Sequence, residues 1–217
     1  MADKAIPIGE SLRFGWETFK KNPFFLIGVF VAISLTTGIL ETVSQREGMS
    51  GLPGVLVDLA ALAVNFLLEI GVIVVVLKLV DGARPEFADV FNQVHLLLNY
   101  GAAALLYLLM ILFGLVFFIV PGVYLAVRFH FFGYFVVDRE AGPIEALKMS
   151  SDLTEGVRME LFAFSLLLLV LIIVGLCFLL VGVFVALPVT SLAMGYVFRY
   201  LQVPPPGRET EVITRVA

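Results

Sequence analysis

The chain has 217 residues, of which 60% are hydrophobic and 15% charged, with a mean hydropathy of +1.04. A soluble domain has roughly 45–50% apolar and about 25% charged residues, so this composition excludes a soluble globular protein and indicates an integral membrane protein. The 14 basic and 18 acidic residues give a net charge of −4, which excludes the clustered positive charge of a nucleic-acid-binding surface.

Six hydrophobic segments are long enough to cross a bilayer, which takes roughly 20 residues of α-helix. The third is expected to stop at Pro121-Gly122, the fourth is short for a span, and Pro188 is expected to kink or shorten the sixth. The sequence therefore predicts an all-α, polytopic membrane helix bundle that forms a single domain over residues 1–202. In chain order, the predicted spans are 24–43, 55–80, 96–120, 123–137, 161–181 and 183–201.

The two ends of the chain differ from the spans. The first residues mix polar and apolar side chains and no small-x-small cleavage pattern follows, so the first span is expected to be a retained signal anchor. Residues 203–217 include Pro204-Pro205-Pro206, which cannot continue a helix, and a mobile cytoplasmic tail is expected there. A docking peptide is the alternative interpretation of this tail.

Lysine and arginine are distributed unevenly between the two sides of the predicted bundle. Six spans place both termini on one side, and ten of the 14 basic residues lie there, with Lys78 and Arg199 at the same ends of their helices. The opposite side carries Arg46, and Arg128 lies within a span. By the positive-inside rule, both termini are predicted to be cytoplasmic.

A threefold pattern runs through the chain: a proline, a short amphipathic stretch and then a pair of spans. The three units begin at Pro7, Pro85 and Pro143, and Val80-Asp81 before the second unit echoes Val137-Asp138 before the third. Proline suits the first turn of a helix because its missing N–H would have no helical partner there. The pattern predicts parallel helix-plus-hairpin repeats with three short cytoplasmic amphipathic helices.

Aromatic residues contribute to the apolar stripes of the first two amphipathic stretches. Trp16 and Phe19 share a face with other apolar residues in the first, as Phe87 and Phe91 do in the second. In one interpretation these four residues are interfacial anchors of helices that lie on the inner leaflet. In the other, the helices pack under the bundle and close the cytoplasmic ends of the spans.

Polar side chains within the second and fourth spans form a candidate intramembrane layer. Asp58, Asn65 and Glu69 share one helical face, and Tyr124 lies one turn before Arg128 on another. Because Glu69 and Arg128 differ in predicted depth by only about 3 Å, we expect them to pair, with Asn65 and Tyr124 as supporting hydrogen-bond partners. Such a pair either binds a charged solute or relays a proton, or it sets the register of the helices.

Motifs of catalysis are absent from the sequence. It has no Gly-x-Ser-x-Gly elbow, no phosphate-binding glycine loop with lysine and no His-Glu-x-x-His pair. One cysteine and two histidines are a poor supply of metal ligands, and His130 and Cys177 are interpreted as packing residues. The sequence therefore predicts no enzyme, no catalytic residues, no metal and no cofactor.

The most distinctive part of the chain extends from Pro121 to Gly156. Together with Trp16-Glu17-Thr18-Phe19-Lys20-Lys21-Asn22-Pro23, it resembles a widespread prokaryotic group of six-span membrane proteins of largely unknown function. This group includes YciC-like proteins and the membrane domain attached to some glycerophosphodiester phosphodiesterases. The motifs that carry the resemblance are Pro121-Gly122-Val123-Tyr124-Leu125-Ala126-Val127-Arg128-Phe129, Val137-Asp138, Gly142-Pro143, Glu145-Ala146-Leu147, Ser150 and Leu153-Thr154-Glu155-Gly156.

The resemblance implies a helical bundle in a prokaryotic cytoplasmic (inner) membrane but no activity, because the chain has no room for a soluble phosphodiesterase domain. The favoured function is that of a non-enzymatic accessory, scaffolding or lipid-contacting protein. The alternative is a small-solute or ion transporter or channel that uses the layer containing Glu69 and Arg128. The lipid bilayer is the expected partner, other membrane proteins or a second copy of the chain are further candidates, and no nucleic acid is expected.

Overall fold

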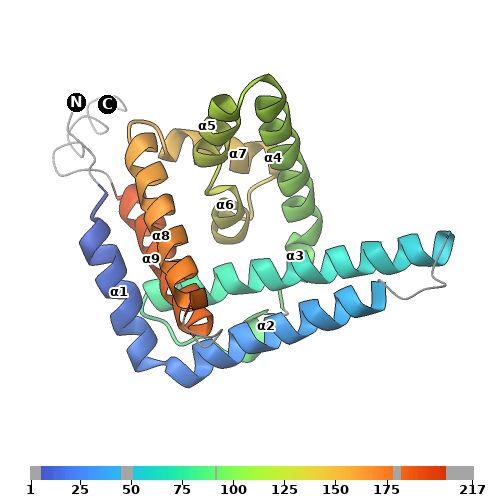
Figure 1. Ribbon diagram of the computed structural model, residues 1–217, viewed down its shortest axis with the longest axis horizontal. Coiled ribbons are helices and arrows are strands. Elements are labelled where there is room, and N and C mark those ends of the chain that lie inside the picture. Colours follow the sequence, from blue (N-terminus) through green and yellow to red (C-terminus); the bar gives the residue numbers. More distant parts are fainter. Residues whose placement is uncertain (1–5, 45–50, 91, 178–181, 204–217) are drawn as a thin grey trace, which may run out of the picture.

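Long apolar helices make up most of the chain, as shown by a computed structural model that describes residues 6–44, 51–90, 92–177 and 182–203 (Figure 1). Six helical segments in these residues are long and apolar enough to cross a membrane. The protein is therefore an all-α, multi-pass membrane protein. The elements are α1 (Ile8–Lys21), α2 (Pro23–Ser44), α3 (Leu52–Val80), η1 (Phe87–Val90), η2 (Val94–Leu96), α4 (Leu97–Phe117), α5 (Ile119–Arg128), α6 (Phe132–Arg139), α7 (Pro143–Leu153), α8 (Arg158–Cys177) and α9 (Val183–Gln202).

Helices α2, α3, α4, α8 and α9 occupy the first, second, third, fifth and sixth predicted spans. Helix α9 continues through Pro188 to Gln202, so of the two expected effects of this proline, a kink or a shortening, the shortening does not occur. The last part of the fifth predicted span, at 178–181, and the predicted tail, at 204–217, fall outside the described residues.

The turn between the third and fourth spans lies at Phe118 and not at Pro121-Gly122. Phe118 has φ −166° and ψ 159°, an extended conformation that ends α4 and precedes α5. Pro121 lies in the first turn of α5, where a missing N–H costs no helical hydrogen bond. A Cβ atom added to Gly114 would lie 2.8 Å from the Cα of Gly122, so these two glycines let α4 and α5 approach closely.

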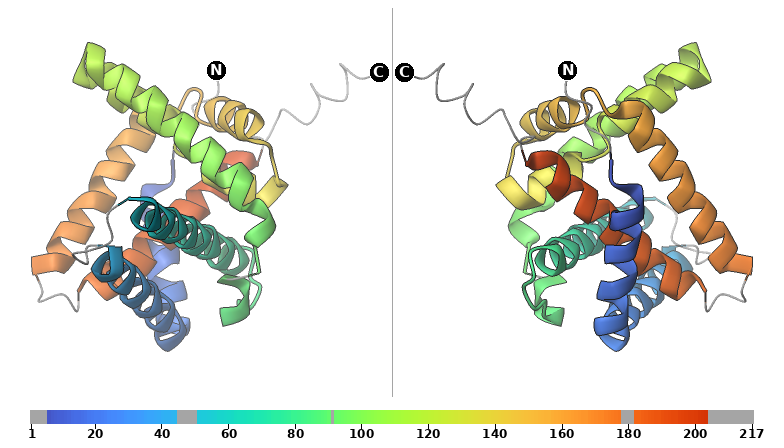
Figure 2. Two further views of the ribbon diagram at one scale, coloured as in Figure 1. Left: turned by 90° about the vertical axis from the view of Figure 1, so that its right-hand side faces the viewer. Right: turned by 90° about the vertical axis from the view of Figure 1, so that its left-hand side faces the viewer.

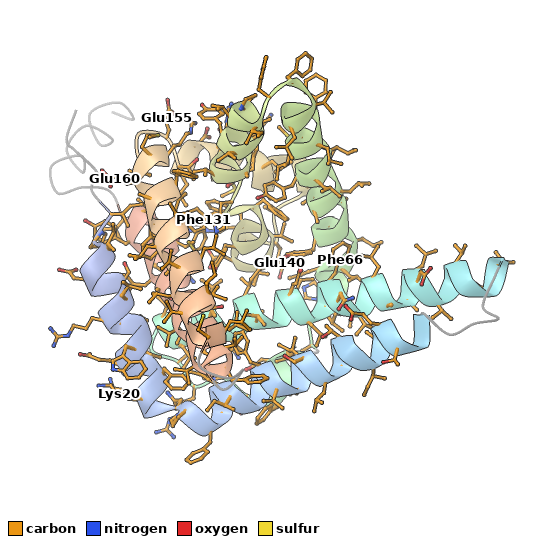
Figure 3. All side chains as sticks on the ribbon, in the orientation of Figure 1. Lys20, Phe66, Phe131, Glu140, Glu155 and Glu160 are labelled. Atoms are coloured by element: carbon orange, nitrogen blue, oxygen red, sulfur yellow. The ribbon has the colours of Figure 1, made fainter. Side chains whose placement is uncertain are left out.

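Three hairpins, α2–α3, α4–α5 and α8–α9, diverge toward their tips (Figures 1 and 2). We call the opposite end, formed by the ends of α3, α6 and α9 together with α7, the base. Fully buried side chains of one hydrophobic core cluster include Ile70, Phe131, Phe164 and Phe198, and Figure 3 places Phe131 deep among the helices. The outer halves of the hairpins expose large apolar side chains, which is the surface expected to face lipid. These include Leu52, Val55, Leu56, Leu59, Phe113, Val116, Phe117, Leu169, Ile173 and Leu176.

Helix α1 packs alongside α9 and is not separated from the bundle (Figure 1). A Cβ atom added to Gly15 would lie 2.5 Å from the carbonyl oxygen of Val189, so only glycine allows this backbone approach. Trp16 is 48% exposed and remains available to an interface, whereas Phe19 is only 7% exposed. Of the two interpretations of α1, the structure therefore has the one in which the helix packs against the bundle. Phe19 is buried there and does not face lipid as an anchor.

The second amphipathic stretch forms the short 3-10 helices η1 and η2 and not the α-helix predicted from the repeat. The carboxylate of Asp89 accepts a hydrogen bond from the backbone N–H of Glu86 (2.7 Å) and pairs with Lys78 Nζ (2.6 Å). Such side-chain bonds to the local backbone compete with a regular helix. Phe87 is 55% exposed and its ring contacts Phe25, whereas Phe91 lies outside the described residues.

Candidate functional site

The fourth membrane segment is broken between α5 and α6, at residues 129–131. Hydroxyl groups of Ser150 in α7 and of Thr154, the C-cap of α7, bind the backbone on both sides of this break. Thr154 Oγ1 and Ser150 Oγ donate to the carbonyl oxygen of Arg128, at 2.9 and 3.3 Å. Ser150 Oγ also accepts a hydrogen bond from the backbone N–H of Phe131, at 3.0 Å.

These hydroxyl groups make the break compatible with a buried position. Ser150, Thr154 and Phe131 are all 0% exposed, so water does not reach the backbone groups at the break. An unpaired backbone group in an apolar interior costs several kcal/mol, and irregular backbone in such an interior persists only where the protein supplies partners. Arg128 and Ser150 belong to the two halves of the distinctive sequence block from Pro121 to Gly156, and these halves therefore meet at the break.

Two arginines converge on Ser151, which follows Ser150 in α7. Arg128 Nε donates to Ser151 Oγ (2.7 Å), and Arg158 Nη2 donates to the carbonyl oxygen of Ser151 (3.3 Å). Arg158 Nη1 donates to the hydroxyl of Tyr124 (2.5 Å), while its buried Nε has no acceptor among the described residues. Within that part of the chain, neither guanidinium forms an ion pair. The result is a site with two cations and neutral oxygen acceptors.

The ion pair expected between Glu69 and Arg128 is not formed in the described structure. Glu69 lies on an exposed face of α3, where its carboxylate accepts a hydrogen bond from the hydroxyl of Tyr100 (3.0 Å). The physical reason is lateral position: α3 packs against α2, α4, α6 and α9, whereas α5 packs mainly against α4 and α8. Matched depth along the membrane normal does not make two helices neighbours.

The other members of the predicted layer are also spread over separate places. Tyr124 binds Arg158 and does not support a Glu69–Arg128 pair. Asn65 is half-buried in α3, and Asp58 is exposed on the outer half of the same helix. The structure thus links Tyr124 to Arg128 through Arg158 and Ser151, but it leaves Asp58, Asn65 and Glu69 on α3.

A second polar cluster joins the ends of three helices at the base. The guanidinium of Arg199, near the end of α9, binds both carboxylate oxygens of Asp81 at 2.9 and 2.6 Å. Its remaining nitrogen, Nη1, lies 2.7 Å from the carboxylate of Asp138. Asp81 follows α3 and Asp138 lies in the last turn of α6, so one arginine links the final helix of each of the three repeats.

The repeated Val-Asp pairs are visible in the sequence, but their shared partner, Arg199, was not predicted from it. Asp81 and Asp138 stand at the ends of the first and second units, and Arg199 stands at the corresponding end of the third. A charge of opposite sign at the third equivalent position is the signal that could have identified the cluster. We call Asp81, Asp138 and Arg199 the base clamp.

Comparisons with known proteins do not place the chain: no family model matches it, and no curated protein or solved structure is similar to it. Within the described residues, no three His, Cys, Asp or Glu side chains gather as metal ligands. The candidate site is therefore defined by its own chemistry: two guanidinium groups, neither of which forms an ion pair within the described residues, lie beside a buried hydroxyl cluster.

Proposed function

We propose that the chain is a non-enzymatic protein of the prokaryotic cytoplasmic membrane, with both termini in the cytoplasm, that serves as an accessory, scaffolding or lipid-contacting protein. One observation carries the proposal. Hydrogen bonds and ion pairs near the base hold helix ends together, while the outer halves of the hairpins expose apolar side chains. A molecule built in this way meets its surroundings through surfaces suited to lipid or to other membrane proteins.

The transporter alternative depends on charges that share a polar layer inside the bundle. Glu69 and Arg128 instead bind Tyr100 and Ser151, on different helices. The middle of the molecule between them is filled by aromatic side chains, such as Phe131, Phe132 and Tyr100, which are at most 8% exposed. This arrangement favours the accessory or scaffolding role over transport.

Flux measurements separate the two functions. The full chain in proteoliposomes is expected to leave the proton and potassium permeability of the vesicles unchanged, and Glu69→Gln is expected to alter neither. Internal pH- and potassium-sensitive dyes report both permeabilities. A flux that the wild-type chain carries and a folded Glu69→Gln variant lacks would establish the transporter in place of the scaffold.

The orientation is tested with the single cysteine of the chain. Cys177 is exposed at the outer end of α8, so a membrane-impermeant maleimide is expected to label it from outside intact spheroplasts. The matched control is Ala83→Cys in a Cys177→Ser background, because Ala83 is exposed on the side of the base. This control is expected to react only after lysis, and the opposite pattern would invert the assigned orientation.

A further inference from the structure

We propose that Arg128, Ser151 and Arg158 bind the phosphate of an anionic phospholipid from the cytoplasmic leaflet, and that one acyl chain of this lipid lies in the groove between α5 and α8. The inference rests on the proposed lipid-contacting function and its orientation. It goes beyond them by assigning a site and a class of lipid.

The charge of the site favours a phosphate ligand. Cations at the edge of an apolar bundle are costly unless an anion neutralises them, yet among the described residues both guanidinium groups donate only to neutral oxygens. Guanidinium forks match phosphate oxygens in geometry, and charge-assisted hydrogen bonds are about twice as strong as neutral ones. A phosphate beside Ser151 would give both arginines an anionic partner.

Carboxylates near the site do not supply this partner. Glu160 accepts a hydrogen bond from the backbone N–H of Ile6 (2.6 Å), which fixes the start of the described chain to α8. Asp152 lines a cavity of about 370 Å³ together with Arg128, and Glu155 is exposed before α8. Among the described residues, none of the three forms an ion pair with Arg128 or Arg158.

The groove between α5 and α8 has the composition of an acyl-chain site. Its volume is about 420 Å³, and Arg158 is the charged residue in its lining. Beyond the Arg158–Tyr124 hydrogen bond the lining is apolar, and much of it is exposed in the isolated chain. The apolar lining residues are Ile119, Val120, Val123, Val127, Met159 and Phe162.

The position of the groove suits a lipid of the cytoplasmic leaflet. Arg158 begins α8, and in Figure 3 Glu155 and Glu160 mark this end of the helix. From there the α4–α5 hairpin and α8 diverge (Figure 2), so the groove opens away from the two arginines. The ten residues of α5 form a helix about 15 Å long, which equals half of a hydrocarbon core about 30 Å thick. A headgroup at Arg158 therefore leaves about the thickness of one leaflet for its acyl chain along α5.

Lipid competition tests the assignment. The full chain, purified in mild detergent, is titrated with phosphatidylglycerol and phosphatidylcholine that carry the same acyl chains, and retained lipid is measured by native mass spectrometry. Phosphatidylglycerol is expected to be retained preferentially. The double variant Arg128→Gln/Arg158→Gln is expected to bind it at least about tenfold more weakly, with phosphatidylcholine unaffected.

Two further variants complete the test. Arg13→Gln is the matched control, because Arg13 is exposed and pairs with Glu17 on α1, and it is expected to bind phosphatidylglycerol like the wild type. Val123→Trp keeps both arginines but fills the groove, so it is expected to lose phosphatidylglycerol while leaving the binding of chain-free glycerol phosphate unchanged. This variant also keeps the proposal testable if the double variant does not fold.

The outcomes have distinct meanings. Equal retention of the two lipids, or unchanged phosphatidylglycerol binding in the folded double variant, overturns the site but not the proposed function. Glycerol phosphate that binds as tightly as the lipid, with no effect of Val123→Trp, assigns the two arginines to a free phosphate and overturns the lipid. Failure of the proposed function would instead appear as a flux through the wild-type chain.

Discussion

Replacing Arg199 with methionine is expected to destabilise the folded chain by about 3 kcal/mol, because two carboxylates at the base lose their shared cation. The Arg199 side chain is 26% exposed, and those of Asp138 and Asp81 are 13% and 46% exposed. Removing one partner of a fully buried ion pair costs about 3–5 kcal/mol, and partial exposure places this cluster at the lower end of that range. Methionine keeps the apolar stem of the arginine side chain and removes the guanidinium group, so the lost stability reports the interactions of that group.

Unfolding in mixed micelles of mild detergent and sodium dodecyl sulfate measures this loss, with the fluorescence of Trp16 as the signal. Trp16 is the single tryptophan of the chain and lies on α1, which packs against α9. The matched control is Lys78→Met, which removes the more exposed partner of the Lys78–Asp89 pair and is expected to cost at most about 1 kcal/mol. Equal losses in the two variants would show that the base clamp contributes no more than an ordinary surface pair.

The spans were predictable from the sequence because hydropathy is a local property. The boundaries of α2 and α9 differ from the predicted spans by one residue at most, since each apolar run ends at polar residues. The Phe118 turn was not predictable in the same way, because an apolar run continues through it. There the backbone conformation and the Gly114–Gly122 approach end the helix, and hydropathy records neither.

The polar contacts were predictable only in part, because sequence gives depth and helical face but not which helices are neighbours. Glu69 and Arg128 match in depth, yet α3 and α5 lie beside different helices. The base clamp joins residues 118 positions apart in the chain, Asp81 and Arg199. The repeat pattern holds the needed information, since equivalent helix ends in parallel repeats meet at one end of a bundle.

The double variant Ser150→Ala/Thr154→Val is expected to destabilise the chain by about 2–4 kcal/mol, because each buried polar group left without a partner costs roughly 1–3 kcal/mol. The N–H of Phe131 loses its acceptor and the carbonyl oxygen of Arg128 loses both hydroxyl donors. Neither substitution adds a charge or changes side-chain size by more than one atom. The loss therefore measures the hydrogen bonds that hold the break between α5 and α6.

Thr36→Val is the matched control, because the Thr36 hydroxyl donates to the carbonyl oxygen of Ala32 within the same helix. That carbonyl belongs to an intact helix, so its loss is expected to cost less than about 0.5 kcal/mol. A double variant no less stable than Thr36→Val would contradict the assigned role and indicate that water reaches the break in the absence of the hydroxyls. A loss confined to the double variant would instead show that the hydroxyls of Ser150 and Thr154 stabilise the break beside Arg128.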